Sequence, residues 1–186
     1  LKTIDPAFSH DGNYIYFSRR TGAWNYNASL PQYQIMTFDR EDGDTEIITT
    51  RYGSAFTPTL SSDGKWLVYG SRFEDQTGLV LRNLLNGEER WLAYPVQSDE
   101  QESIAALGVL PAISFTPDKQ NLIASYGGKI YSISISNNKA TEIPFEVDVE
   151  LDLGPMVSIK YPISDKSEAF VTQIRDAVPS PDGSKL

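Results

Sequence analysis

The chain has 186 residues, with 16 Lys or Arg against 25 Asp or Glu, so its net charge is −9. Nucleic acids and anionic membranes are bound through clustered Lys and Arg, and this acidic balance argues against both as the main partner. There is no cysteine and a single histidine, His10, which argues against a thiolate or multi-histidine metal centre. No window approaches the about 18 consecutive apolar residues of a membrane span. We therefore expect no cofactor and no membrane insertion.

One sequence motif occurs three times and begins a fourth time. A short apolar run ends in Ser or Thr, a turn built on Asp-Gly or Pro-Asp follows, and then comes a run rich in Tyr, Ile, Val and Trp. The copies lie at 5–18, 57–70, 110–124 and 177–186. Asp-Gly between apolar runs is a strong hairpin signal, because Asp caps the turn and Gly accepts a positive φ. Each copy therefore predicts a β-hairpin.

Two further strands are predicted after each hairpin. They lie at 34–39 and 45–50, at 79–84 and 89–93, and at 129–135 and 140–144. Four short strands that repeat in this way are typical of a β-propeller blade, whereas a β-sandwich would not repeat the same turn in every unit. We predict an all-β fold, a partial β-propeller of four-stranded antiparallel blades. The blades are expected near 4–50, 56–94 and 110–145, with a fourth beginning near 172.

The number of blades predicts that residues 1–186 are one partial domain of a larger protein. Closed propellers have roughly four to eight blades, and terminal blades leave strand edges that need cover. The chain begins directly on an expected inner strand and ends where a second strand should follow. We expect either pairing with a second copy through open blade edges or membership of a longer closed ring.

The repeated hairpin resembles the propeller repeats of the TolB family, and WD-like repeats of tricorn-type and prolyl-oligopeptidase-type peptidases. Segments 18–35, 51–58, 89–95 and 174–183 further resemble the propeller region that precedes the catalytic barrel of large bacterial amidohydrolase-like proteins. That resemblance implies an exported parent, periplasmic or secreted, with a metal-dependent hydrolase domain downstream. The metal ligands of that family lie in the barrel, and none can be assigned here because the chain has no His-x-His.

Three local patterns suggest chemistry, but each has a simpler interpretation. His10 stands between Ser9 and Asp11, yet a catalytic triad needs its side chains arranged around a substrate, so we interpret His10 as a turn residue. The acidic turn at 41–44 offers too few converging oxygens for calcium. The alternating acidic residues of 146–153 predict an edge strand with a solvated acidic face. We predict no catalytic and no metal-binding residue in this chain.

The long connections are the stronger candidates for function. In a propeller, the connections from the second to the third strand and from the fourth strand to the next blade emerge on one face. Exposed Trp, Tyr and Arg are favoured at interfaces. An equally good alternative is that these side chains fold over the blades as a satellite core. The candidate interface or ligand residues are Arg19, Arg20, Trp24, Tyr26, Tyr33, Arg51 and Tyr52.

The sequence thus predicts a propeller module with no catalytic activity of its own. Its expected partner is an adjoining catalytic domain, another protein or an incoming substrate of an amidohydrolase-like hydrolase. Two alternatives remain open: a stand-alone TolB-type binding propeller of the cell envelope, and the filter propeller of a prolyl-oligopeptidase-like serine peptidase.

Overall fold

A computed structural model describes residues 3–23, 29–98, 110, 112–155, 158, 160–163, 165–168, 171–173 and 175–185. The chain divides into two compact units, Leu1–Glu146 and Val147–Leu186. The described residues include no helix with the length and hydrophobicity needed to cross a bilayer.

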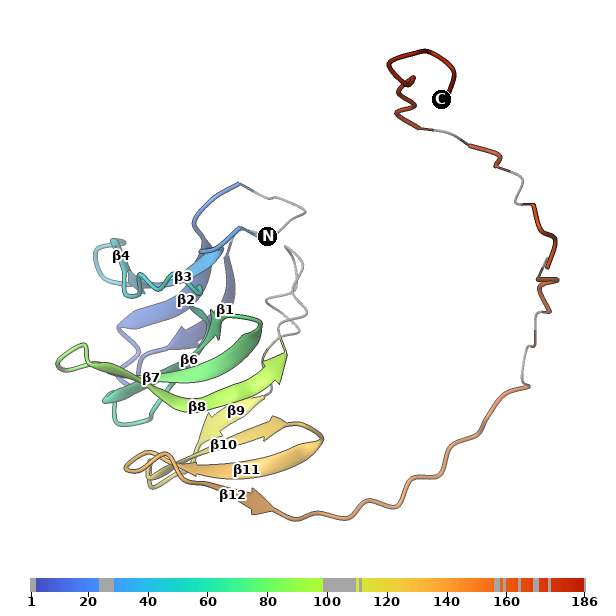
Figure 1. Cartoon of the computed structure of the whole chain (residues 1–186). Coiled ribbons are helices and arrows are strands. Elements are labelled where there is room, and N and C mark those ends of the chain that lie inside the picture. Colours follow the sequence, from blue (N-terminus) through green and yellow to red (C-terminus); the bar gives the residue numbers. More distant parts are fainter. Residues whose placement is uncertain are drawn as a thin grey trace. The chain divides into compact units, whose positions relative to one another are not determined.

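The first unit contains three four-stranded antiparallel sheets, which we call blades 1, 2 and 3 (Figure 1). Blade 1 consists of β1 (Thr3–Phe8), β2 (Tyr14–Arg20), β3 (Tyr33–Asp39) and β4 (Thr45–Ile47). Blade 2 consists of β5 (Phe56–Leu60), β6 (Trp66–Phe73), β7 (Gln76–Asn83) and β8 (Glu89–Ser98). Blade 3 consists of β9 (Ile113–Phe115), β10 (Asn121–Tyr126), β11 (Lys129–Ser134) and β12 (Ala140–Ile143). The strands of each blade follow one another in chain order, which confirms the predicted all-β propeller architecture.

The repeated turn has the same hydrogen bonds in every copy. In blade 2, the Ser61 hydroxyl donates to the Asp63 carboxylate (2.6 Å) and accepts from the backbone N–H of Trp66 (2.9 Å). The carboxylate also accepts from the Lys65 N–H at 3.2 Å. Equivalent bonds form around Asp11, Asp118 and Asp182. The predicted role of Asp as the cap of this turn is therefore confirmed.

Blades 1 and 2 pack face to face through an apolar layer. Neighbouring residues of a strand point to opposite faces of its sheet, so Leu67 and Tyr69 of β6 face blade 1 together with Val80 of β7. Ile35 and Ile48 of blade 1 lie in the same cluster. All these side chains except Ile48 are fully buried.

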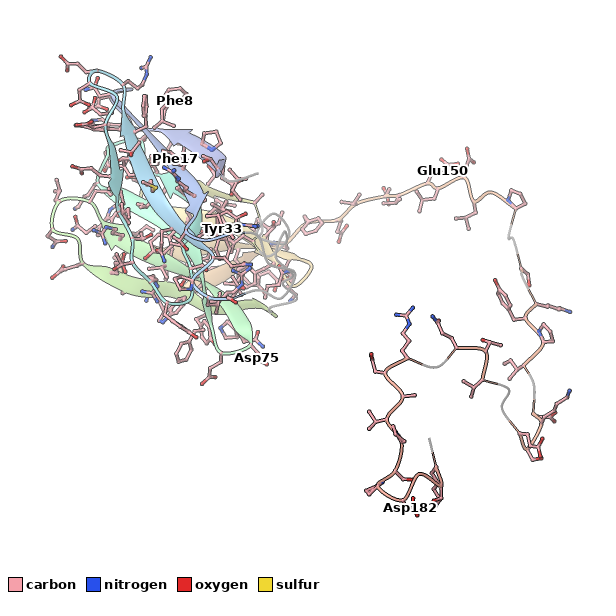
Figure 2. The ribbon with its side chains drawn as sticks, turned by 90° about the horizontal axis from the view of Figure 1, so that it is seen from above. Phe8, Phe17, Tyr33, Asp75, Glu150 and Asp182 are labelled. Carbon is pink, nitrogen blue, oxygen red and sulfur yellow. The ribbon has the colours of Figure 1, made fainter. Side chains whose placement is uncertain are left out.

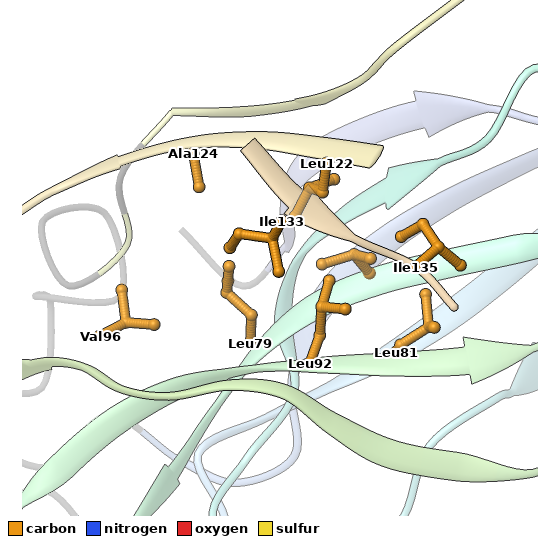
Figure 3. Close-up of a cluster of buried hydrophobic side chains, with 9 residues drawn as sticks. Leu79, Leu81, Leu92, Val96, Leu122, Ala124, Ile133 and Ile135 are labelled. Atoms are coloured by element: carbon orange, nitrogen blue, oxygen red, sulfur yellow. The ribbon is translucent and has the colours of Figure 1, made fainter. Parts of the chain in front are cut away.

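Blades 2 and 3 pack through the other face of blade 2 (Figure 3). The buried side chains of this layer are Val68, Leu79, Leu81, Leu92, Val96, Leu122, Ala124, Ile133 and Ile135. Burial of a whole Leu side chain stabilises a fold by about 1.5–3 kcal/mol. Blade 2 therefore buries both of its faces, and its packing holds the other two blades.

The second unit has no strand among its described residues. The predicted edge strand at 146–153 is wrong: this segment pairs with no sheet, and the side chains of Val147, Val149, Leu151 and Leu153 are exposed. A strand needs a neighbouring backbone for its hydrogen bonds, and alternation of side chains alone does not supply one. Residues 180–185 nevertheless form the repeated turn.

We predict that the Asp182 carboxyl titrates well below the usual pH for Asp. Hydrogen bonds from the Ser180 hydroxyl and from Ser184 stabilise its charged form and lower its pKa from 3.8 to about 2. Because the folded pKa is lowered, the carboxylate stabilises the turn above about pH 4, and this effect is lost as the pH falls toward 2. An NMR pH titration of the full chain measures this pKa. In the Ser180→Ala variant the pKa should rise, and identical titration of both proteins would contradict the prediction.

Candidate functional site

Three connections meet at one end of blades 1 and 2. The residue that ends β2, Arg20, pairs with Tyr33, where β3 begins. The segment before β5 joins them, since the Ala55 N–H donates to the Tyr33 carbonyl at 2.8 Å. The end of β6 reaches the same segment, because the Arg72 N–H donates to the Gly53 carbonyl at 2.8 Å. We call this end, residues 20–23, 29–33, 51–55 and 72–74, the loop face.

Gly53 permits this close approach. A Cβ at position 53 would lie 1.7 Å from the Arg72 carbonyl oxygen, so no other residue fits without a shift of the backbone. The hydroxyl of the neighbouring Ser54 accepts from the Gln32 N–H at 2.8 Å. The connections of blade 1 are thus tied to blade 2 by backbone contacts.

Two cavities lie on the loop face, and Leu30 lines both. The smaller has a volume of about 360 Å³ and is lined by Arg20, Gly22, Ala23, Ser29, Leu30, Pro31 and Gln32. The larger has a volume of about 640 Å³ and is lined by Leu30, Arg51, Tyr52, Gly53, Arg72, Phe73 and Glu74. Cavities that combine apolar walls with a few charged groups are suited to binding a ligand or a partner's side chain.

Arg20 and Tyr33, both predicted site residues, lie together beneath the smaller cavity. The Arg20 guanidinium donates to the Tyr33 hydroxyl at 3.2 Å and lies 5.4 Å from the centre of its ring. Arg20 is 8% exposed and Tyr33 is 3% exposed. The Arg20 guanidinium is therefore held in one position, and only a small part of the Arg20 surface is exposed to the cavity.

Arg51 spans from blade 1 to blade 2. Its guanidinium donates to the Ser71 hydroxyl at 3.1 Å and to Glu89 at 3.3 Å, and it lies 4.9 Å from the centre of the Trp91 ring. Its neighbour Tyr52 is 78% exposed and contributes an aromatic ring to the wall of the larger cavity. These two adjacent residues therefore differ: Arg51 is bound within the protein, and Tyr52 is accessible.

Glu89 connects Arg51 to blade 2. Its carboxylate accepts from the Tyr69 hydroxyl at 2.7 Å and from Arg82 at 2.8 Å, in addition to Arg51. Burial, together with the hydrogen bond to Glu89, raises the pKa of Tyr69 above its usual value, so Tyr69 stays protonated and donates. This network anchors Arg51, the neighbour of Tyr52 on the loop face, to blade 2.

The other predicted site residues lie elsewhere or outside the described residues. Arg19 alternates with Arg20 along β2 and therefore lies on the opposite face of blade 1. Trp24 and Tyr26 fall outside the described residues. His10 is exposed in the turn of blade 1, where its imidazole lies against Gly64 in the turn of blade 2. Within the described ranges, no cluster of three or more His, Cys, Asp or Glu side chains is arranged to hold a metal ion.

Arg72 belongs to the site but was not among the predicted residues. It is 2% exposed, and its guanidinium lies 4.7 Å from the centre of the Phe56 ring. The repeat contained the signal, because aligning the turns at Asp11 and Asp63 makes Arg72 the counterpart of Arg20. In both blades, an Arg in the last two residues of the second strand is held over an aromatic ring.

No protein-family profile matches this chain, and no curated protein matches its sequence. Solved structures with a similar fold include TolB from Acinetobacter baumannii, with a TM-score of 0.57 and 18% identity over 77% of this chain and 32% of that chain. The tricorn protease gives a TM-score of 0.53 and 18% identity over 74% of this chain and 12% of its own. The β-propeller domain of the Trilobed protease from Pyrococcus furiosus gives 0.51 and 12% identity over 76% of this chain and 43% of its own.

The chain spans less than half the length of each of these structures. At such low identity the similarity concerns the fold alone. The stacked four-stranded blades and these neighbours together establish that the chain has the β-propeller fold found in TolB and in peptidase propeller domains.

We predict that Glu89→Ala lowers the free energy of unfolding by about 2 kcal/mol, because it leaves the Tyr69 hydroxyl and two Arg side chains without their shared acceptor. Thermal unfolding measures the loss. The adjacent Glu88 is exposed, so Glu88→Ala should change stability by less than about 0.5 kcal/mol. Equal melting temperatures for the two variants would show that the network does not stabilise the fold.

Proposed function

We propose that this chain is the non-catalytic propeller module of a larger exported bacterial protein. In this proposal, the loop face contacts an adjoining catalytic domain, or the substrate on its way to that domain. The observation that supports it best is the pair of cavities that meet at Leu30 and bring together arginine and aromatic side chains from both blades.

The rigidity of the loop face supports an interaction role. Arg20 and Arg72 are held over aromatic rings, and Arg51 is held by Glu89 and Trp91. A surface whose side chains are already ordered loses less conformational entropy when it binds. Beside these fixed groups, Tyr52 and Phe73 are exposed, and aromatic residues contribute strongly at interfaces.

The parent we favour is an amidohydrolase-like hydrolase. Its support is the resemblance of segments 18–35, 51–58, 89–95 and 174–183 to the propeller region of those proteins. The metal ligands of such an enzyme would lie in a separate barrel domain, where a bound metal would activate water. The module would then support the barrel or control access to it, in the periplasm or outside the cell.

Two alternatives each have an observation in their favour. The similarity to TolB favours a stand-alone protein-binding propeller, and the similarity to the tricorn and Trilobed proteases favours the filter propeller of a peptidase. The sequence of the complete gene separates them. A downstream His-x-His followed by further His and Asp ligands supports the hydrolase, and Gly-x-Ser-x-Gly supports the peptidase. Propeller repeats with neither motif support the binding protein.

Hydrogen exchange tests the role of the loop face directly. We predict that backbone amides of 29–34, 51–55 and 72–76 exchange at least several-fold more slowly in the full-length parent than in the isolated chain. The turns at 9–13 and 61–65, at the opposite end of the blades, serve as the internal control and should not change.

Variants in the parent sharpen this test. Tyr52→Ala should remove part of the protection, whereas Leu85→Ala, at an equally exposed residue in a turn of blade 2, should leave it intact. Equal exchange of the loop face in the isolated chain and in the parent would contradict the proposal.

A further inference from the structure

Three aromatic side chains lie in contact with one another at the edge of blade 2. Phe73 ends β6, and Trp91 and Tyr94 belong to β8, the last strand of the sheet. The centre of the Tyr94 ring lies 5.9 Å from that of Phe73 and 5.0 Å from that of Trp91. Phe73 is 55% exposed and Tyr94 is 37% exposed, so a partner can reach these rings. We call Phe73, Trp91 and Tyr94 the aromatic row.

The neighbouring strand and blade 1 hold the aromatic row in place. A Cβ at Gly78 of β7 would lie 2.8 Å from the Trp91 ring and 2.8 Å from the Tyr94 ring, so only glycine leaves room for both. The Tyr94 hydroxyl donates to the Phe73 carbonyl at 2.9 Å, and the Arg51 guanidinium lies over the Trp91 ring. Rings that are already ordered lose less conformational entropy when a ligand binds.

The aromatic row lies between two cavities. Phe73 lines the larger cavity of the loop face. Trp91 and Tyr94 line a further cavity of about 380 Å³ along β8, together with Pro95 of β8 and Tyr126 of blade 3. An extended ligand that crosses the aromatic row therefore contacts both cavities. We call the cavity along β8 the edge cavity.

The edge cavity favours a ligand with few hydrogen-bond donors. Apart from its aromatic residues, its one polar side chain in the described part of the chain is Asn138. The Asn138 amide already donates to the Trp91 carbonyl at 2.8 Å and accepts from Arg90. A saccharide would leave many of its hydroxyls without partners here, which is unfavourable. Proline has no backbone N–H, and proline-rich segments in the polyproline II conformation bind grooves lined by aromatic rings.

Acidic side chains flank the aromatic row. Glu74 and Asp75 form the turn between β6 and β7, and both are exposed. Figure 2 labels Asp75 at the edge of the first unit. Neither carboxylate forms an ion pair with another described residue. Desolvation and these two negative charges raise the pKa of the Tyr94 hydroxyl, so their field reaches the aromatic row. A ligand with a positive charge is therefore favoured.

The arginines of the larger cavity leave this preference in place. Arg51 is paired with Glu89 at 3.3 Å. Arg72 is 2% exposed and lies against the Phe56 ring. A ligand on the aromatic row therefore meets exposed rings and exposed carboxylates before either guanidinium.

We propose that the aromatic row binds an extended, proline-rich peptide segment that carries Lys or Arg. The prolines lie on the rings and in the edge cavity, and a basic side chain lies beside Glu74 and Asp75. Such a segment is already extended before binding, so it loses little entropy. The inference goes beyond the proposed function, because it needs no catalytic domain. The two share Phe73, which also belongs to the loop face.

Isothermal titration of the full chain tests the proposal. The probe is a synthetic peptide of about six prolines, roughly two turns of polyproline II helix, with a pair of arginines at each end. It should bind at a single site. Tyr94→Ala should weaken binding about tenfold, because it removes the central ring of the aromatic row. Equal affinity of this variant and the unaltered chain would overturn the proposal.

Two further variants serve as controls. Tyr94→Phe keeps the ring and should bind nearly as well as the unaltered chain. Leu85→Ala changes a side chain that is 81% exposed in the turn between β7 and β8, and it should leave binding unchanged. Thermal unfolding confirms that each variant remains folded.

The charge and the class of the ligand are tested separately. Glu74→Gln combined with Asp75→Asn removes both charges at almost constant volume, and it should weaken binding several-fold at low salt and less at high salt. A peptide with glutamates in place of the arginines should not bind. Cellohexaose offers flat sugar rings without charge. Binding of this saccharide in place of the peptide, or of neither, would overturn the proposal. Because these titrations use the chain alone, such a failure leaves the predicted protection of the loop face in the parent intact.

Discussion

The face-to-face packing of four-stranded sheets is the interaction on which the rest of this structure depends. A single small sheet exposes two faces and gains too little burial to be stable alone, so each blade needs a neighbour. The side chains of β6 alternate between the two faces of blade 2, so this strand packs against both neighbouring blades. Leu67 and Tyr69 pack against blade 1, and Val68 packs against blade 3. The faces of blades 1 and 3 that point away from blade 2 pack against no other described sheet.

The candidate site is a consequence of this packing. The loop face combines connections from two blades, and it exists only because Gly53 lets the segment before β5 approach the end of β6. Arg51 then crosses to Ser71, Glu89 and Trp91 of blade 2. A change in the contact between the blades would therefore change the walls of the larger cavity, which combine residues 51–53 with residues 72–74. This coupling is consistent with the proposal that the loop face is a binding surface.

Much of the fold could be predicted because its signals are local. The side chains of the Ser or Thr and of the Asp in each turn make their hydrogen bonds within five positions, so the turn can be predicted from a short stretch of sequence. The predicted edge strand at 146–153 failed for the opposite reason, since a strand depends on a partner that may lie anywhere in the chain or outside it. The alternation of acidic and apolar residues in that segment does not identify such a partner.

The site was less predictable, because its chemistry depends on contacts between blades. Sequence reasoning assigned Arg20 and Tyr33 to one long connection, and the structure reveals a hydrogen bond between their side chains that was not predicted. It grouped Arg19 with Arg20, although the alternation of a strand separates them to opposite faces. It treated Arg51 as a candidate ligand residue, and only the packed structure reveals that Glu89 and Trp91 bind it. Arg72 could have been found by extending the repeat alignment to the ends of the second strands.

The most direct test of this account is the thermal unfolding of two shortened chains beside the full one. Residues 1–146 keep all three blades, whereas residues 1–98 lack blade 3 and expose Leu79, Leu81 and Leu92 of blade 2. If packing between blades supplies the stability, the chain 1–146 should melt like the full chain. The chain 1–98 should then melt more than about 10 °C lower or lose its cooperative transition. Equal melting of all three chains would mean that each blade is stable without its neighbour, which would contradict the account.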